Sequence, residues 1–185
     1  MIVLQGKSPK ILVIGDLMID HYLWGSCERI SPEAPVQVIN VGEESISLGG
    51  AGNVINNLNA LGAHVDVISV IGNCETSGKL KALLANIKVN TKYLIIQNKR
   101  ITSKKTRIIS SQQQVVRYDH ESTDEISDES QKSILAYFKK LVSNYDAVLL
   151  SDYGKGVLTI ELTQSLITIA NNKNKKVLFR YITRY

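Results

Sequence analysis

The stretch Leu48-Gly49-Gly50-Ala51-Gly52-Asn53 stands between an extended segment and an amphipathic run in which Val54, Leu58 and Leu61 recur at helical spacing. Glycine lets the backbone adopt positive φ and approach a bound molecule closely. The N-terminus of the predicted helix offers unpaired N–H groups and a positive dipole end, which suit an anionic or oxygen-rich ligand. Asn53 adds an amide acceptor and two N–H donors. The asparagine and the first two glycines are therefore candidate binding residues; the alternative is a tight turn whose glycines only permit close packing.

Two continuous apolar runs, residues 10–16 and 146–152, each end in an aspartate, Asp16 and Asp152. Such runs are typical of buried parallel strands, whose carboxyl ends carry functional groups in open α/β sheets. Further strands are predicted at 36–41, 64–72 and 176–179, and helices after Asn53, at 75–86, from the Ser127 cap onward and from Thr159 to about 171. The alternation predicts an α/β fold built from βαβ units.

Residues 92–118 differ in character from the rest of the chain. Three short pieces rich in β-branched residues, 93–96, 102–109 and 113–118, predict strands without intervening helices. We therefore expect some separate antiparallel material beside the main sheet.

Composition indicates which class of protein this chain belongs to. A chain of 185 residues with 44% hydrophobic and 21% charged residues is typical of one globular domain. Two cysteines cannot form a disulfide framework and indicate a reducing compartment. The three histidines lack ligand spacing, so no metal site is expected. With no apolar run of about 18 residues and no apolar segment before Lys10, we expect a cytoplasmic protein without a membrane partner.

The net charge of +5 is unevenly distributed. Residues 79–107 hold nine Lys or Arg and no acid, whereas residues 119–129 hold six acids and no Lys or Arg. A basic stretch can bind nucleic acid, but this one has only Tyr93 among its aromatics and matches no nucleic-acid-binding motif. Most of its lysines are expected to form a solvated face, and a minority could meet a small anionic substrate.

The pattern Gly49-Gly50-Ala51-Gly52-Asn53 followed by Gly62 and Gly72 resembles the first signature of the ribokinase-like (PfkB) carbohydrate kinases. Within them the chain is similar to the kinase domain of the bifunctional heptose 7-phosphate kinase/heptose 1-phosphate adenylyltransferases. The residues that carry this resemblance are Ile14-Gly15-Asp16 with Asp20, Arg29-Ile-Ser-Pro-Glu-Ala-Pro-Val36, Lys105-Thr-Arg107, Gln113-Gln114, Arg117-Tyr-Asp119 and Leu150-Ser-Asp-Tyr-Gly-Lys-Gly156. Two positions depart from the pattern: Ile55 replaces a small residue, and Gly72-Asn73-Cys74 stands where relatives carry Gly-Asp-Asp.

The resemblance implies an enzyme that transfers the γ-phosphate of ATP, with Mg²⁺, onto the anomeric hydroxyl of D-glycero-β-D-manno-heptose 7-phosphate. This step serves ADP-heptose biosynthesis for the lipopolysaccharide core. The implied fold is a central sheet flanked by helices, with a small β-sheet lid over the sugar site, often used for dimerisation. Residues 1–178 would form the N-terminal part of this kinase domain, with lid strands within about 20–41 and 92–118.

The resemblance also suggests roles for single residues. Asp16 and Asp20 would accept hydrogen bonds from hydroxyl groups of the sugar, and Gly49, Gly50 and Asn53 would form the floor of its site. Arg29, Lys105 and Arg107 are candidates for the 7-phosphate through charge-assisted bonds. Gln113 and Gln114 would bind hydroxyls or pair within a sheet, and Asp152 and Lys155 follow the second buried strand, where Lys155 could help with phosphate charge. For each charged residue the alternative is a solvated or structural role.

The family's second signature, Asp-x-x-Gly-Ala-Gly-Asp, supplies an anion hole and the catalytic base, and this sequence has no glycine after Gly156. No catalytic residue is therefore predicted within this chain, which is expected to be an inactive fragment. Residues 179–185 resemble nothing in the family, which suggests a frameshift. The alternatives are another PfkB-type sugar kinase, or a non-catalytic sugar-phosphate-binding or dimerisation module. Resumption of kinase sequence in another frame downstream would favour a broken enzyme.

Overall fold

The computed structural model describes residues 8–181 of the chain, which form two β-sheets and four α-helices. In chain order the elements are β1 (Lys10–Gly15), β2 (Leu17–Ile30), β3 (Gln37–Gly50), α1 (Ala51–Ala60), β4 (His64–Ile71), α2 (Glu75–Asn86), β5 (Leu94–Ile96), β6 (Ser103–Ser110), β7 (Gln113–His120), α3 (Asp128–Leu141), the 3-10 turn η1 (Val142–Asn144), β8 (Ala147–Asp152), α4 (Ile160–Asn172) and β9 (Lys176–Tyr181).

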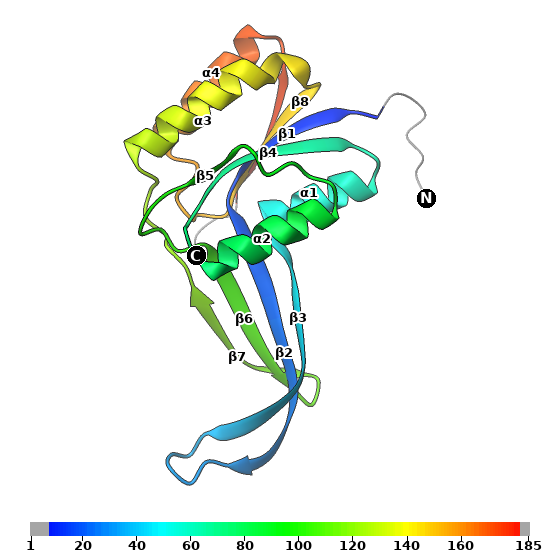
Figure 1. Ribbon diagram of the computed structural model, residues 1–185, viewed down its shortest axis with the longest axis vertical. Coiled ribbons are helices and arrows are strands. Elements are labelled where there is room, and N and C mark those ends of the chain that lie inside the picture. The colour runs from blue at the N-terminus through cyan, green and yellow to red at the C-terminus, as the bar shows by residue number, and fades with distance from the viewer. Residues whose placement is uncertain (1–7, 182–185) are drawn as a thin grey trace.

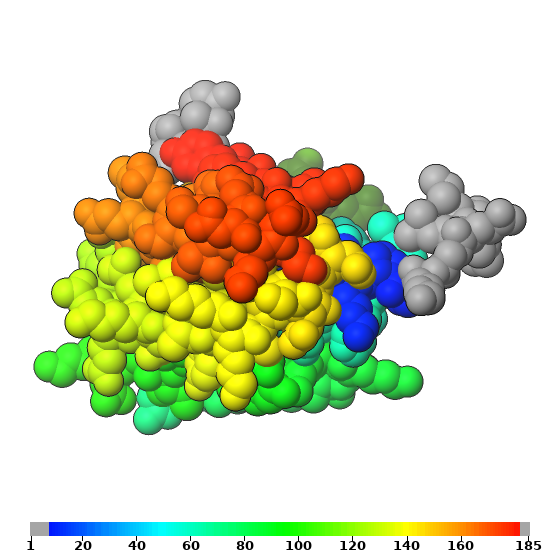
Figure 2. Space-filling model, turned by 90° about the horizontal axis from the view of Figure 1, so that it is seen from above, coloured from blue at the N-terminus to red at the C-terminus, as the bar shows by residue number. Residues whose placement is uncertain are grey.

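The central sheet has the strand order β5-β4-β1-β8-β9, and all of its pairings are parallel. Helices α3 and α4 cover one face, and α1 and α2 cover the other (Figure 1). Seen from above in Figure 2, α3 (yellow) and α4 (orange to red) lie side by side. This α/β arrangement is the one that the apolar strand runs predicted, since strands covered on both faces need apolar side chains on both sides.

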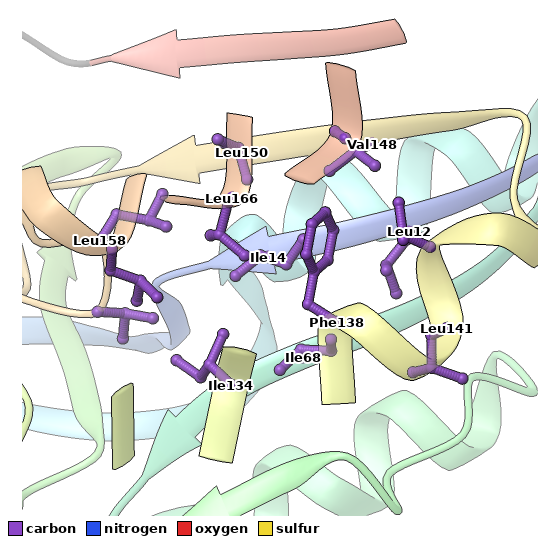
Figure 3. Packing of buried hydrophobic residues seen from close by; sticks show 14 of the residues in the cluster. Leu12, Ile14, Ile68, Ile134, Phe138, Leu141, Val148, Leu150, Leu158 and Leu166 are labelled. Carbon is purple, nitrogen blue, oxygen red and sulfur yellow. The ribbon is translucent and has the colours of Figure 1, made fainter. Parts of the chain in front are cut away.

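Successive residues of β1 divide between the two faces of the sheet. Leu12 and Ile14 are fully buried in the cluster under α3 and α4, where they meet Phe138 (Figure 3). Val13, between them, is buried in the second cluster, under α1 and α2. Helix α3 begins where the sequence predicted, because the Ser127 side chain accepts a hydrogen bond from the backbone N–H of Ser130.

The second sheet has the order β3-β2-β6-β7 and extends from the carboxyl end of β1, as Figure 1 shows. Strands β2 and β3 form a long antiparallel ribbon whose tip reaches beyond β6 and β7 (Figure 1). Two register shifts, at Trp24/Gly25 and Cys27/Arg29, interrupt this ribbon. Bulges of this kind bend and twist a strand pair. We call the four-stranded sheet the lid sheet.

Three details differ from the sequence-based expectations. Strand β3 continues to Gly50 and α1 begins at Ala51, so the glycine-rich segment is a strand-to-helix junction without a separate turn. Strand β5 pairs with β4 in the central sheet, so the expected lid range of 92–118 is wrong for Leu94–Ile96. Strand β9 continues to Tyr181, so the first residues of the expected tail extend the sheet, and residues 182–185 lie outside the described part.

Among the described residues, no helix combines the length and apolar character needed to cross a bilayer.

Candidate functional site

A cavity of about 420 Å³ lies between the lid sheet and the loop that follows β8. Its position beyond the carboxyl ends of β1 and β8 is where open α/β sheets bind ligands. The residues that line it come from β2, β6, β7, the β3–α1 junction and the loop after β8: Met18, Asp20, Gly50, Asn53, Lys105, Arg107, Arg117, Tyr153 and Lys155.

The floor of the cavity depends on two glycines. Gly50 has φ +58°, and a Cβ there would lie 2.5 Å from the backbone oxygen of Asp16, so both the conformation and the space favour glycine. A Cβ on Gly49 would lie 2.4 Å from Oδ2 of Asp20. Because these two glycines have no side chain, β3 approaches β2 closely. The start of α1, with Asn53, therefore lies at the cavity.

One wall of the cavity contains an ion pair on the lid sheet. Arg107 Nη1 donates to Asp20 Oδ1 at 2.5 Å, and its guanidinium lies 5.3 Å from the centre of the Tyr22 ring. The register explains the geometry, since Tyr22 and Arg107 are direct partners across β2 and β6. Both side chains of the ion pair are largely buried. The Asp20 carboxylate is thereby held at the cavity as an acceptor.

A chain of alternating charges continues from the lid sheet to the loop after β8. Asp119 accepts from Lys105 Nζ at 2.7 Å and from Arg117 Nε and Nη2, each at 3.0 Å. Glu121 accepts from Lys105 at 3.5 Å and from Lys155 at 2.5 Å. The three cations line the cavity and the two acids do not. This wall therefore presents N–H donors to a ligand, as an anionic group requires.

Electrostatics keep Asp119 ionised within this chain. Burial raises its pKa, but hydrogen bonds from Lys105 and Arg117 and their positive charges outweigh burial and hold the pKa below its ordinary value. The carboxylate consequently stays a fixed anchor for both cations at neutral pH.

Asp16 is 1% exposed and does not line this cavity. Its Oδ2 accepts from the backbone N–H groups of Tyr153 (2.7 Å) and Lys155 (3.1 Å), and its Oδ1 accepts from Val157 (3.1 Å). Burial raises the pKa of Asp16, and the three N–H groups oppose this rise. In this structure the residue holds the loop after β8 in place, and Lys155 with it, where the sequence predicted contact with a sugar hydroxyl.

Arg100 also binds the loop that follows β8. Its guanidinium is buried and donates to the backbone oxygens of Lys155 and, at 3.1 Å, of Asp124. Asp124 lies in the segment that leads out of the lid sheet towards α3. The buried arginine thus joins the lid exit to the loop that carries Lys155.

Six of the twelve sequence-predicted site residues line the cavity: Asp20, Gly50, Asn53, Lys105, Arg107 and Lys155. Gly49 does not line the cavity itself, but its lack of a side chain leaves room for the carboxylate of Asp20, which does. Asp152 accepts the N–H of Gly154 at 2.7 Å, which shapes the loop. Gln113 and Gln114 are exposed at the start of β7, where they pair with β6.

Arg29 does not reach the cavity in its own chain. It lies near the far end of the β2–β3 ribbon and lines a separate depression with Glu28, Val38, Ile39 and Asn40. The structure therefore places Arg29 apart from Lys105 and Arg107, the other two candidates for the 7-phosphate, because the length of the ribbon carries it away from β6.

Three lining residues were missed as candidates: Met18, Arg117 and Tyr153. Arg117 had a detectable signal, because it lies on the predicted strand 113–118 two residues before Asp119, and residues two apart in an extended chain share one face. In the part of the chain that the structure describes, no group of three or more His, Cys, Asp or Glu residues is arranged to hold a metal ion.

Residues 8–183 match the profile of the pfkB family carbohydrate kinases. This chain belongs to the PfkB family. The match includes both sheets and all four helices, so the cavity lies within the region that defines the family.

Curated relatives of this PfkB chain include proteins that carry the name Bifunctional protein HldE. The protein of Aliarcobacter butzleri is 63% identical over 93% of this chain, and that of Sulfurimonas denitrificans is 56% identical over 95%. The chain spans only 36% and 37% of the length of these two relatives.

Solved structures show the same fold at low sequence identity. The Arabidopsis thaliana ribokinase complexed with ribose and ATP has a TM-score of 0.63 and 15% identity, with 93% of this chain and 53% of that chain covered. A carbohydrate kinase from Agrobacterium tumefaciens has a TM-score of 0.60 and 20% identity, with 92% and 53% covered. The PfkB chain described here thus has the ribokinase-like architecture.

Cys74, at a position where the family pattern has an acid, offers a test of the local structure. Burial raises its pKa, but hydrogen bonds from Ser77 and Thr102 outweigh burial and lower the pKa to about 7. Because the thiolate is the reactive form, alkylation by iodoacetamide should rise with pH and reach half its maximal rate near pH 7. Mass spectrometry of peptides containing Cys74 would measure this rate. In Ser77→Ala the midpoint should move to higher pH; an unchanged midpoint would contradict the assigned hydrogen bond.

Proposed function

We propose that this chain forms the sugar-phosphate-binding part of a kinase that phosphorylates D-glycero-β-D-manno-heptose 7-phosphate at its anomeric hydroxyl, with ATP as donor. The observation that carries the proposal is the division of the cavity lining. Asp20, Gly50 and Asn53 offer polar groups suited to sugar hydroxyls, whereas Lys105, Arg107, Arg117 and Lys155 offer cations suited to a phosphate. The name of the curated relatives, and their 63% and 56% identity, support the choice of substrate.

The chemistry expected of each group follows from its hydrogen-bonding capacity. Asn53 can accept from one hydroxyl and donate to another, which orients a sugar from two sides. Asp20 can accept a hydrogen bond from a sugar hydroxyl while Arg107 balances its charge. Lys105 and Arg107 can bind the 7-phosphate through charge-assisted hydrogen bonds. Such positioning matters because phosphoryl transfer depends mainly on alignment and on stabilising the charge of the moving group.

The catalytic base is proposed to lie outside these cavity residues. The nearby carboxylates already have partners: Asp20 binds Arg107, Asp119 binds Lys105 and Arg117, and Asp16 binds three backbone N–H groups. The four cations fit anionic oxygens, but the described residues hold no metal-binding cluster. We infer that Mg²⁺ would arrive bound to ATP and that a nucleotide site would need residues beyond this cavity.

A homodimer through the lid sheet and a cytoplasmic location are part of the proposal. The β2–β3 ribbon exposes several large apolar or aromatic side chains, which favours its use as an interface: Trp24, Ile30 and Val41, together with Val36 beside the tip. The same observation favours the second candidate function, a non-catalytic sugar-phosphate-binding or dimerisation module.

Asn53→Ala should weaken binding of heptose 7-phosphate. Loss of a hydrogen bond to a bound polar group costs about 1–3 kcal/mol, or roughly 5- to 150-fold in affinity. Isothermal titration calorimetry of the full chain would measure the change. Asn56→Ala is a matched control, because Asn56 is an exposed asparagine of the same helix. Equal affinities of the two variants would rule out the assigned sugar site, and absence of binding to the unsubstituted chain would count against the proposed substrate.

A further inference from the structure

The lid sheet places two arginines directly opposite each other. Arg107 on β6 and Arg117 on β7 are partners in the antiparallel register, and both line the cavity. Like charges at directly opposed positions destabilise a β-sheet. If the lid sheet had only a structural role, an opposite-charge pair or a β-branched pair at these two positions would make it more stable. The pair therefore indicates a task that needs two guanidinium groups side by side.

Each arginine is oriented by a different carboxylate. Arg107 donates through Nη1 to Asp20, and Arg117 donates through Nε and Nη2 to Asp119. These contacts separate the two like charges and set the direction of each planar group. Asp119 also accepts from Lys105. The two guanidinium groups are thus oriented before any ligand binds, which lowers the entropy that binding must overcome.

Positive charge remains in excess on this wall. Four cations line the cavity, Lys105, Arg107, Arg117 and Lys155, and three carboxylates contact them, those of Asp20, Asp119 and Glu121. Guanidinium groups match the oxygens of a phosphate in pairs, whereas a neutral hydroxyl gains little from a second cation. The excess therefore suits a ligand that carries a phosphate.

We infer that Arg117 is a specificity-determining residue which, with Arg107, makes the site prefer a phosphorylated sugar to the same sugar without its phosphate. This inference rests on the proposed sugar-phosphate function and deepens it, because it assigns the discrimination to the β6–β7 arginine pair. Arg117 binds the phosphate and makes no contribution to the sugar hydroxyls. Loss of Arg117 should consequently weaken binding of the phosphorylated sugar and leave the affinity for the same sugar without its phosphate unchanged.

The test titrates the full chain and Arg117→Gln with heptose 7-phosphate, with unphosphorylated heptose and with inorganic phosphate. Arg117→Gln should bind heptose 7-phosphate and inorganic phosphate roughly 10- to 100-fold more weakly, and unphosphorylated heptose within about twofold of the original affinity. Arg117→Lys should recover part of the loss, because it restores the charge without the paired donors. Thermal melting would confirm that both variants fold.

Lys104→Gln is the matched control for net charge. Lys104 is adjacent to Lys105 on β6, so its side chain points to the opposite face of the lid sheet, and it does not line the cavity. It should leave all three affinities within about twofold. A similar loss in Lys104→Gln and Arg117→Gln would overturn the inference, because long-range charge alone would then explain the effect.

The outcomes separate the inference from the proposed function. If heptose 7-phosphate fails to bind while inorganic phosphate binds and is weakened by Arg117→Gln, the substrate is wrong and the arginine pair stands. If heptose 7-phosphate binds, two results would overturn the arginine inference and leave the substrate standing. In one, Arg117→Gln weakens the binding of both sugars equally; in the other, it weakens the binding of neither. Failure of all three ligands to bind the unsubstituted chain overturns both.

Discussion

No ADP release above background is expected when the purified 185-residue chain is mixed with ATP, Mg²⁺ and heptose 7-phosphate. A sugar hydroxyl is a weak nucleophile, and a positioned base contributes about 10²- to 10⁴-fold to its reaction. Removal of one anion-hole donor costs on the order of 10²- to 10³-fold. The Asp-x-x-Gly-Ala-Gly-Asp signature, to which the resemblance assigns both functions, does not occur in this sequence, so we expect a rate lower by about 10⁴-fold or more.

A coupled ADP assay would measure the rate, with the Bifunctional protein HldE of Aliarcobacter butzleri, 63% identical, as the comparison enzyme. We also expect no rescue of heptose-kinase-deficient cells. Robust turnover that disappears in Asp152→Asn would contradict the prediction, because the chemistry would then reside at the carboxyl end of β8. Turnover that survives Asp152→Asn would equally contradict it and would point to a base elsewhere in the chain.

Asp16→Ala should destabilise the fold by about 3–5 kcal/mol. The substitution removes the acceptor of three backbone N–H groups, those of Tyr153, Lys155 and Val157, at a position that is 1% exposed. Each buried donor left without a partner costs about 1–3 kcal/mol, and partial access of water should keep the total below the sum. Urea denaturation followed by circular dichroism would measure the change in unfolding free energy.

Two further variants serve as comparisons for the stability of Asp16→Ala. Asp16→Asn keeps the shape and one acceptor oxygen but turns an NH₂ group towards backbone donors, so it should be intermediate. Glu33→Ala, at the exposed tip between β2 and β3, should change stability by less than about 0.5 kcal/mol. Equal stability of Asp16→Ala and the unsubstituted chain would show that the loop after β8 does not depend on this carboxylate.

Local signals in the sequence predicted most of the central sheet and its helices. The apolar runs at 10–16 and 146–152 became β1 and β8, side by side and parallel. Ser127 and Thr159 cap α3 and α4 through hydrogen bonds to the N–H groups of Ser130 and Leu162. These features were predictable because each depends on the burial or hydrogen bonding of neighbouring residues in the chain.

The lid sheet was predicted less well. Strand β2 changes along its length from buried residues to exposed ones, and its register shifts at Trp24/Gly25 and Cys27/Arg29 break any simple alternation. Strand β5 resembled the lid pieces in composition but pairs with β4. Composition alone could not assign β5 to one sheet, because β-branched residues favour any pleated, half-buried surface.

For this protein, the sequence by itself determined the α/β class, the glycine-rich segment before the helix and the residue types of the proposed sugar-phosphate site, since these follow from periodicity, backbone freedom and side-chain chemistry. Only the tertiary structure decided which of those residues meet. It brought Lys105, Arg107, Arg117 and Lys155 to one cavity, carried Arg29 to the far end of the ribbon and turned Asp16 onto a loop. The physical reason is that strand register and long-range pairing set distances between side chains, and no local pattern in the chain encodes them.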